Sequence, residues 1–316
     1  MGKRVILDCD PGTDDSVAII LALKSAELTV EAITCVSGNL TADRAANNAL
    51  KILDLIGADD IPVAKGMLTP LVRPYPSDPF SHGEDGLGNT ELPASQRQLD
   101  PRFAADVIVD TVVAHPNEVT LITTGPMTNI ALAIQRAPEI VDLVPEMIAI
   151  AGSFGFNQYA HMYATGDNPV SEWNVYVDPE AAKIVFHSGI PVMAIGVDIF
   201  SDPRVNYTAE HLAALRNSNN KESQYVLDLV KFVLNRSYQS YCVQIDTMAV
   251  AAAIDKSIFQ TKRIHVDVET KGELTLGQTV TDVREHHRWD HIPQIDASYS
   301  ADFSKYLDLL VDRITK

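Results

Sequence analysis

The chain has 316 residues, of which 46% are hydrophobic, and 25 basic against 42 acidic side chains give a net charge of −17. This composition suffices for a large core, but it excludes the basic surface that nucleic-acid binding needs. No apolar run reaches the roughly 18 residues that span a membrane, and no signal-peptide layout is present. The odd count of three cysteines has no metal spacing. We therefore expect a cytoplasmic protein that binds neither nucleic acid nor membrane.

Strand-like and helix-like patterns alternate over the first two-thirds of the chain. Strands are predicted at 4–9, 29–36, 118–123, 145–151 and 191–196, and helices at about 15–25, 41–57, 102–115, 126–137 and 179–187. Such alternation predicts an α/β fold, in which a mostly parallel central sheet carries helices on both faces. The remainder is predicted as two or three helices over 208–254, a strand at 263–268, a hairpin near 273–281 and a helix at 302–315. We expect a single domain over 1–316.

Two long segments interrupt the alternation. Residues 67–100 are rich in proline and glycine, and residues 153–173 mix glycine, asparagine, tyrosine, histidine and methionine. Loops this long inside a compact domain are uncommon and usually functional. Both follow predicted strands, so we expect them to reach the same edge of the sheet.

Four aspartates gather where the first strand gives way to the first helix, namely Asp8, Asp10, Asp14 and Asp15. In an open α/β sheet, ligands bind at the carboxyl ends of the strands. Carboxylates so close together repel one another, and a dication is the simplest way to hold them. Their hard oxygen ligands favour Ca²⁺ or Mg²⁺. The alternative, that acids complement a helix N-terminus, accounts for only one or two of the four.

The segment DCDPGTDD at 8–15 resembles the opening signature of the nucleoside hydrolases, which cleave the N-glycosidic bond of ribonucleosides. Five later segments resemble motifs of that family in the same order: VSGN at 36–39, HGEDGLG at 82–88, TTGPMTNIA at 123–131, SEWNVYVDPEAA at 171–182 and GELTLGQTV at 272–280. The resemblance runs from residue 4 to about residue 312. It implies one catalytic domain with the open sheet of that family.

The resemblance also implies a Ca²⁺ site. Its expected ligands are the carboxylates of Asp10, Asp15 and Asp246 and the backbone carbonyl of Thr124. Such an ion lowers the pKa of a water molecule that it binds, and Asp10 is expected to act as the catalytic base that removes the proton. Attack on C1′ then releases ribose and a free nucleobase, a reaction of purine or pyrimidine salvage. Asp8 is expected to support the loop.

The ribose-binding positions that the resemblance implies are Asp14, Asn39, Glu172, Trp173 and Asn174. Carboxylates and amides suit a vicinal diol, because each hydroxyl both donates and accepts. Asn39 alone would also fit a turn residue after a glycine. Relatives carry one more asparagine at the position of Gly166, and Asn168 is expected to replace it.

The chain departs from several relatives just before Asp246. Those relatives carry a histidine there, which protonates the leaving nucleobase, whereas this chain has Ile245. An isoleucine cannot donate a proton, so Ile245 is expected to pack against the nucleobase or to seal the pocket. Either another group is the acid, or the nucleobase leaves with little help. His82, the candidate acid among the predicted catalytic residues, matches a histidine at the edge of the nucleobase pocket, although an exposed loop histidine would look the same. Other candidates are His161, Tyr238 and Tyr241.

We therefore expect a Ca²⁺-dependent ribonucleoside hydrolase that binds a small-molecule nucleoside and forms a homodimer or homotetramer, as its relatives commonly do. The nucleobase preference stays open. One alternative is a hydrolase of the same fold that acts on a non-standard N-riboside, and another is a protein that binds metal and ribose with weak or no turnover. A nicotinamide-dependent dehydrogenase is not favoured, because no Gly-x-Gly-x-x-Gly follows the first strand.

Overall fold

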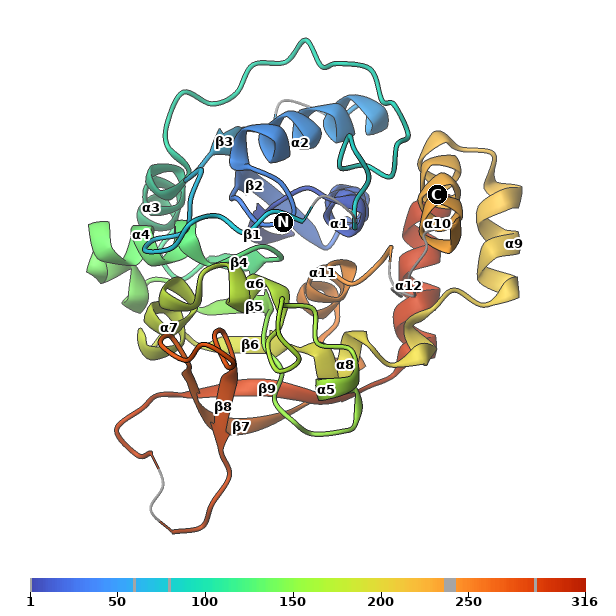
Figure 1. The fold of residues 1–316 in the computed structure, drawn as a ribbon. Coiled ribbons are helices and arrows are strands. Elements are labelled where there is room, and N and C mark those ends of the chain that lie inside the picture. The colour runs from blue at the N-terminus through green and yellow to red at the C-terminus, as the bar shows by residue number, and fades with distance from the viewer. Residues whose placement is uncertain (1, 59–60, 79–80, 236–242, 287–288) are drawn as a thin grey trace.

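The computed structural model describes residues 2–58, 61–78, 81–235, 243–286 and 289–316. A nine-stranded sheet runs through these residues in the order β3-β2-β1-β4-β5-β6-β9-β7-β8 (Figure 1). The strands are β1 Lys3–Cys9, β2 Leu28–Cys35, β3 Val63–Lys65, β4 Val119–Thr123, β5 Glu146–Ile150, β6 Val192–Ile195, β7 Phe259–Val268, β8 Thr279–Asp282 and β9 Gln294–Ala301. Neighbours from β3 through β9 are parallel, and β7 is antiparallel to both β9 and β8.

Helices cover both faces of the sheet (Figure 1). The α-helices are α1 Thr13–Leu23, α2 Ala42–Ile56, α3 Ala104–Ala114, α4 Thr128–Arg136, α5 Tyr159–Met162, α6 Trp173–Val177, α7 Pro179–His187, α8 Val197–Phe200, α9 Ala209–Ser218, α10 Lys221–Asn235, α11 Thr247–Ile254 and α12 Phe303–Thr315. One core packs α1, α2, α11 and α12 against the sheet, and the other packs α3, α4 and α7. The predicted α/β architecture is confirmed.

Strand β1 shows why this sheet needs two helical layers. Val5, Leu7 and Cys9 belong to one core, whereas Ile6 belongs to the other. Successive side chains of a strand point to opposite faces, so an unbroken apolar run is stable only when both faces are covered. Cys9 pairs in register with Cys35 of β2, and both are buried as expected. The third cysteine, at 242, lies outside the described residues.

Most predicted elements are present within a few residues of their expected bounds, but the C-terminal strands differ. The hairpin expected near 273–281 is wrong, because residues 269–278 form the connection between β7 and β8, and those two strands make the hairpin. Strand β9, which inserts between β6 and β7, was not predicted. Its sequence QIDASYSA has mostly small or polar residues, and only long-range pairing selects the extended form.

The position of the site follows from the topology. β1 lies between β2 on one side and β4 on the other, so the chain winds away from β1 in both directions. Loops that follow strands on the two sides of such a point diverge and leave a crevice. The acidic loop follows β1 at that place, and it is flanked by the loops after β2 and β4. No helix in the described part of the chain is long and apolar enough to cross a membrane.

The backbone conformation at the C-terminal end of helix α2 can be tested by substitution. It ends at Gly57, which has a φ of 64° in the left-handed region, and a Cβ there would meet no atom within 4 Å. Replacing Gly57 by alanine should therefore lower the free energy of unfolding by about 1 kcal/mol through backbone strain alone. Gly57→Asn should cost less, because asparagine tolerates this conformation. Urea denaturation measures both variants, and equal stability of Gly57→Ala and the unchanged protein would contradict the assignment.

Candidate active site

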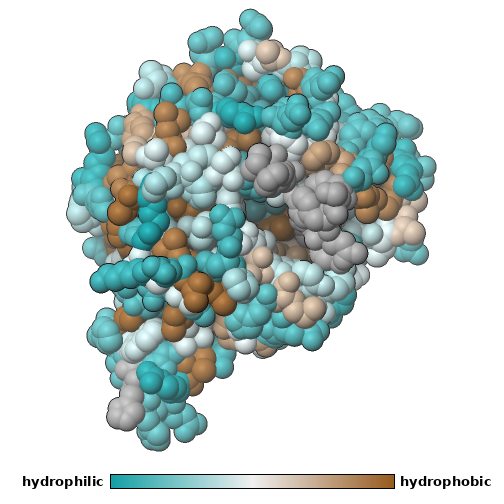
Figure 2. Space-filling model, in the orientation of Figure 1, coloured by the Kyte–Doolittle hydropathy of each residue, from teal (hydrophilic) through white to brown (hydrophobic). Residues whose placement is uncertain are grey.

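A pocket of about 370 Å³ opens at the edge of the sheet where β1, β2, β4 and β5 end. Figure 2 shows a hollow near the centre of this face, bordered by hydrophilic and hydrophobic residues. The polar lining includes Asp14, Asn39, Thr124, Glu172, Asn174 and Asp246. Apolar lining comes from Ile150, Met162, Phe200 and Ile245. One cavity thus combines a polar wall suited to a sugar with an apolar wall suited to a planar base.

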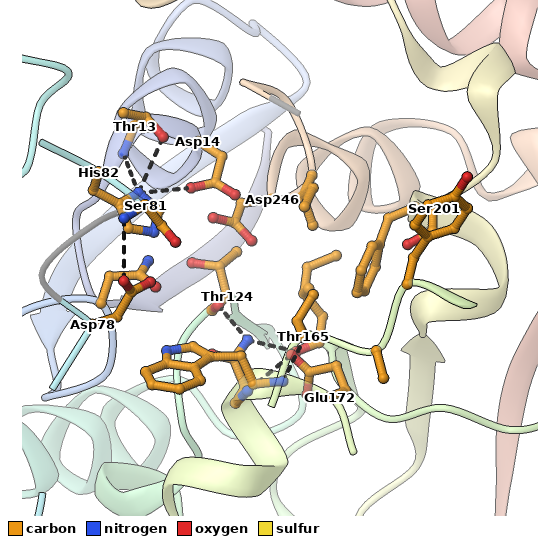
Figure 3. Close-up of a pocket in the computed structure, with 18 of the residues that line it drawn as sticks. Thr13, Asp14, Asp78, Ser81, His82, Thr124, Thr165, Glu172, Ser201 and Asp246 are labelled. Carbon is orange, nitrogen blue, oxygen red and sulfur yellow. Dashed lines mark hydrogen bonds and ion pairs between the residues drawn. The ribbon is translucent and has the colours of Figure 1, made fainter. Parts of the chain in front are cut away.

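Three buried carboxylates lie close together in and beneath this pocket. Asp14, Asp15 and Asp246 can each offer an oxygen such that all three atoms lie within 4.8 Å of one another. The first two stand on the first turn of α1, and Asp246 precedes α11 (Figure 3 labels Asp14 and Asp246). This grouping contains two of the expected ligands, Asp15 and Asp246. It differs from the expected set because Asp14, predicted to bind ribose, takes the place of Asp10.

Asp15 and Asp10 are held differently. Asp15 accepts four hydrogen bonds, from the backbone N–H groups of Asp10 and Gly12, from Thr124 Oγ1 at 2.7 Å and from Asn39 Nδ2 at 3.1 Å. Asp10 Oδ2 accepts from the Asn39 backbone N–H at 2.5 Å, whereas its Oδ1 is buried and has no hydrogen-bond partner within the described part of the chain. Asp10 therefore keeps an acceptor for a molecule bound in the pocket.

Burial makes this cluster electrostatically costly. Removal from water raises the pKa of Asp10 well above its usual value, and the charge of Asp15 raises it further. Burial likewise raises the pKa of Asp246, with added repulsion from Asp14, Asp15 and Asp10. Charged carboxylates in a low-dielectric environment are stable only when protons or cations offset their repulsion. The cluster therefore suits a divalent cation, and its oxygen-only donor set suits a hard ion such as Ca²⁺ or Mg²⁺.

Glycines from three motifs allow this close packing. A Cβ at Gly38 would collide with Asp10 Oδ2, and one at Gly125 would lie 2.6 Å from Asp10 Oδ1. A Cβ at Gly12 would lie 2.5 Å from Nδ1 of His82. Each of three motifs, namely VSGN, TTGP and the first motif, thus provides a glycine at a point where a side chain of the site contacts the backbone.

The wall of the pocket opposite His82 is built around Glu172 (Figure 3). Its carboxylate caps α6 by accepting from the N–H groups of Asn174 at 2.8 Å and Val175 at 3.1 Å, and it also accepts from Gly152 N–H. Burial outweighs these bonds and raises the pKa of Glu172 to about 7. Asn174 Nδ2 donates to the carbonyl of Thr124 at 2.7 Å. A carbonyl oxygen has two lone pairs, so Thr124, the expected carbonyl ligand, retains one.

Trp173 also lines the pocket, as expected. Its ring stacks on Tyr176 with centroids 6.0 Å apart, and its indole Nε1 is buried without a hydrogen-bond partner among the described residues. Its backbone N–H donates to Thr165 Oγ1 at 2.7 Å. The stacked ring and the capped helix together fix this wall before any ligand binds.

Asn168, which is expected to contact the sugar, lies outside the pocket. Asn168 is absent from the pocket lining, because Nδ2 donates to the carbonyl of Leu276 and Oδ1 accepts from Ser171 Oγ and from the Val170 N–H. Its amide therefore serves the loop rather than the cavity. A side chain at Gly166 is also excluded, because a Cβ there would collide with Ser171 Oγ. Next to Gly166, Thr165 lines the pocket, and its Oγ1 accepts from the Trp173 N–H.

His82 lies on the far side of the acidic cluster from α6 (Figure 3). Its Nδ1 accepts from the Thr13 backbone N–H at 3.1 Å and also lies 3.1 Å from Thr13 Oγ1. The same nitrogen is 3.8 Å from Asp14 Oδ1, too far for a hydrogen bond. The structure thus places the predicted histidine in the pocket wall, and 9% of its surface is exposed.

The other leaving-group candidates have different outcomes. Ile245 lines the pocket. His161 is exposed and is not part of the lining. Positions 238 and 241, the two tyrosine candidates, lie outside the described residues.

Several lining residues were not predicted individually. They are Thr13, Asp78, Ser81, Ile150, Met162, Tyr163, Ala164, Thr165, Phe200 and Ser201. Most come from the segments 67–100 and 153–173, and their length was the signal that these loops serve the site. Phe200 and Ser201 follow β6 through α8, and no pattern in the sequence marks them.

Known proteins resemble this chain over almost its whole length. The sequence profile of the family described as "Inosine-uridine preferring nucleoside hydrolase" matches residues 5–308. The chain is 36% identical over 322 residues to such a hydrolase of Leishmania major, covering 100% of this chain and 98% of that protein. It is 35% identical to a pyrimidine-specific ribonucleoside hydrolase of Citrobacter koseri, over 99% of this chain and 98% of that protein.

Solved structures show the same relationship. A plant nucleoside hydrolase superposes with a TM-score of 0.87 at 32% identity, covering 100% of this chain and 99% of that one. A purine-preferring ribonucleoside hydrolase from Gardnerella vaginalis also gives 0.87, at 31% identity and with 99% and 98% covered. A match over almost the whole length, in sequence and in fold, shows that the protein belongs to the inosine-uridine preferring nucleoside hydrolase family and is an N-glycosyl hydrolase.

Proposed function

We propose that the protein hydrolyses ribonucleosides to ribose and a free nucleobase, depends on Ca²⁺, and serves nucleoside salvage. The observation that supports this most directly is the group of buried carboxylates, Asp14, Asp15 and Asp246, beside a polar wall in one pocket. A neutral nucleoside can enter such a negative cavity without electrostatic penalty, whereas a nucleotide would be repelled.

The residues present fit a divalent cation. Asp15 and Asp246 would hold it with the free lone pair of the Thr124 carbonyl, and Asp14 or Asp10 would complete the carboxylate set. When bound, such an ion lowers the pKa of a coordinated water and orients substrate oxygens. Ca²⁺ is proposed over Mg²⁺ because it tolerates irregular sets of six to eight oxygen ligands.

The side chains of the site have separate roles in the proposed reaction. Asp10, whose Oδ1 has no hydrogen-bond partner within the described residues, accepts the proton of the attacking water. Asp14, Asn39, Glu172 and Asn174 bind the ribose hydroxyls, and Trp173 closes the wall beside them. As the C1′–N bond breaks, the sugar gains oxocarbenium character. The surrounding carboxylates stabilise that positive charge.

The nucleobase leaves at the other end of the pocket. There His82 is the proposed hydrogen-bond donor, and Ile245 packs against the base together with Phe200. The electron pair of the broken bond stays on the nucleobase nitrogen, which takes up a proton as it is released. The donor on this side thus determines how readily a poor leaving group departs.

Nucleobase preference is the point at which the relatives diverge, since their names include inosine-uridine preferring, pyrimidine-specific and purine-preferring enzymes. One observation favours a second candidate function, hydrolysis of a non-standard N-riboside. It is the apolar Ile245 in the lining, next to Asp246. A base that leaves without protonation would need no histidine there.

We further propose a cytoplasmic homodimer or homotetramer, by analogy with the family.

The first test replaces the proposed base. Asp10→Asn should lower the release of reducing sugar from inosine, adenosine, guanosine, uridine and cytidine by at least about a hundredfold, the usual contribution of a general base. Assays run with Ca²⁺ and with a chelator, and Asp228→Asn, at an exposed position of α10, serves as the matched control. A folded Asp10→Asn enzyme that retains turnover would refute the role of Asp10. Activity only on modified ribosides would favour the second candidate.

Metal binding should be visible in stability. Saturating Ca²⁺ at about a hundred times its Kd should add about 2.7 kcal/mol to the free energy of unfolding. Asp246→Asn removes one repelling charge without changing shape. The metal-free variant should therefore melt above the metal-free parent, and Ca²⁺ should raise its Tm much less. Calorimetry with Ca²⁺, Mg²⁺ and chelator measures this, and equal Ca²⁺ shifts for both proteins would exclude Asp246 as a ligand.

The pH dependence has a definite sign. In the metal-free protein the pKa values of Asp10 and Asp246 are raised by burial and repulsion. Such groups stabilise the fold below the unfolded-state pKa of about 4, and this stability is lost as the pH rises through their folded-state values. Ca²⁺ replaces the missing protons, so its effect on Tm should be larger at about pH 8 than at about pH 5.5. A Ca²⁺ shift independent of pH would contradict this linkage.

A further inference from the structure

Thr13 presents two hydrogen-bond donors to one ring nitrogen. Its backbone N–H donates to His82 Nδ1 at 3.1 Å, and its Oγ1 lies 3.1 Å from the same atom. Thr13 is the first residue of α1, where backbone N–H groups have no partner within the helix. The bond to His82 therefore uses a donor that the helix leaves available, and both residues lie in the pocket lining.

This contact determines the tautomer of the ring. A backbone N–H can only donate, so Nδ1 must be the acceptor and must carry no proton. The Thr13 hydroxyl then donates to the same lone pair. In a neutral imidazole the proton consequently resides on Nε2. Among the described residues Nε2 makes no hydrogen bond, although His82 lines the pocket, so its N–H is available to a ligand.

We propose that Thr13 is a positioning residue, which holds His82 as the Nε2–H tautomer so that this N–H donates to the departing nucleobase. The inference rests on the proposed hydrolase function and identifies the group that acts where Ile245 replaces the histidine of other family members. A neutral imidazole held at a helix N-terminus is an effective donor toward an atom that gains negative charge. His82 keeps its proton throughout, and the released nucleobase is protonated by water.

The chain offers a graded series of variants at this position. Thr13→Ser keeps both donors, Thr13→Val keeps only the N–H, and Thr13→Pro removes both. Proline is tolerated at the first position of a helix, and the extended Gly12 before it, with φ −95° and ψ −157°, lies outside the α region that a following proline disfavours. The proline ring would occupy the space of the N–H and displace His82.

Kinetics on a nucleoside test the proposal. We expect Thr13→Ser to match the parent, Thr13→Val to lower kcat about fivefold with little change in KM, and Thr13→Pro to approach His82→Ala. These substitutions should lower kcat rather than raise KM, because the hydrogen bond from His82 to the leaving group strengthens only in the transition state. In a His82→Ala background, Thr13→Val should have no further effect, since residues that act through one another are not additive.

A second substrate separates positioning from structure. A 4-nitrophenyl riboside releases a stable phenolate that needs no donor, so the parent and Thr13→Val should cleave it equally. A loss on both substrates, or a Thr13→Val effect that persists without His82, would overturn the proposal. If the parent cleaves neither substrate, the hydrolase function itself fails. Nitrogen-15 NMR of labelled histidine still decides the tautomer in that case, because a protonated Nδ1 on His82 would contradict the role of Thr13.

Discussion

The site depends on keeping several negative charges together away from water. Asp10, Asp14, Asp15 and Asp246 are all buried at the crevice between β1 and its neighbours. Several features of the surrounding structure offset the repulsion between these carboxylates. Asp15 accepts four hydrogen bonds, two of the acids stand on the first turn of a helix, where its dipole favours negative charge, and glycines let the backbone approach Asp10 closely. What remains uncompensated is the repulsion that makes the cluster suited to a cation.

The two walls of the pocket differ in how they are held. The proposed ribose side is fixed by contacts to the backbone, since Glu172 caps α6 and Asn174 bonds to the carbonyl of Thr124. The proposed nucleobase side relies on side chains from loops and short helices, such as His82 and Phe200. A rigid sugar site beside a more adaptable base site is consistent with relatives that share a ribonucleoside substrate but differ in base preference.

Local patterns in the sequence predicted the α/β alternation and the acidic loop, and motif order named nine of the nineteen residues that line the pocket, because strand ends and motif order constrain where these residues lie. They did not predict β9, whose polar residues become a strand only through pairing with β6 and β7. The side chain of Asn168 lies outside the pocket lining, because its amide bonds to Ser171 in its own loop and to the carbonyl of Leu276 in the connection between β7 and β8. The hydrogen bond between Thr13 and His82 could not be predicted either, because 69 positions separate the two residues in the sequence and only the folded loop brings them together.

Strand β9 and helix α11 give the chain's C-terminal third a part in a site that begins at its N-terminus. Asp246 reaches the acids of α1 only when α11 has packed against α1 and the strands beneath it, and β9 must enter between β6 and β7 to complete the sheet. A ribosome delivers the N-terminal part first, and such distant contacts form slowly. The nascent protein thus carries an incomplete acidic cluster until the segment that contains α11 and β9 has been synthesised and has folded, so assembly of the full carboxylate set reports that these late elements have joined the sheet and α1.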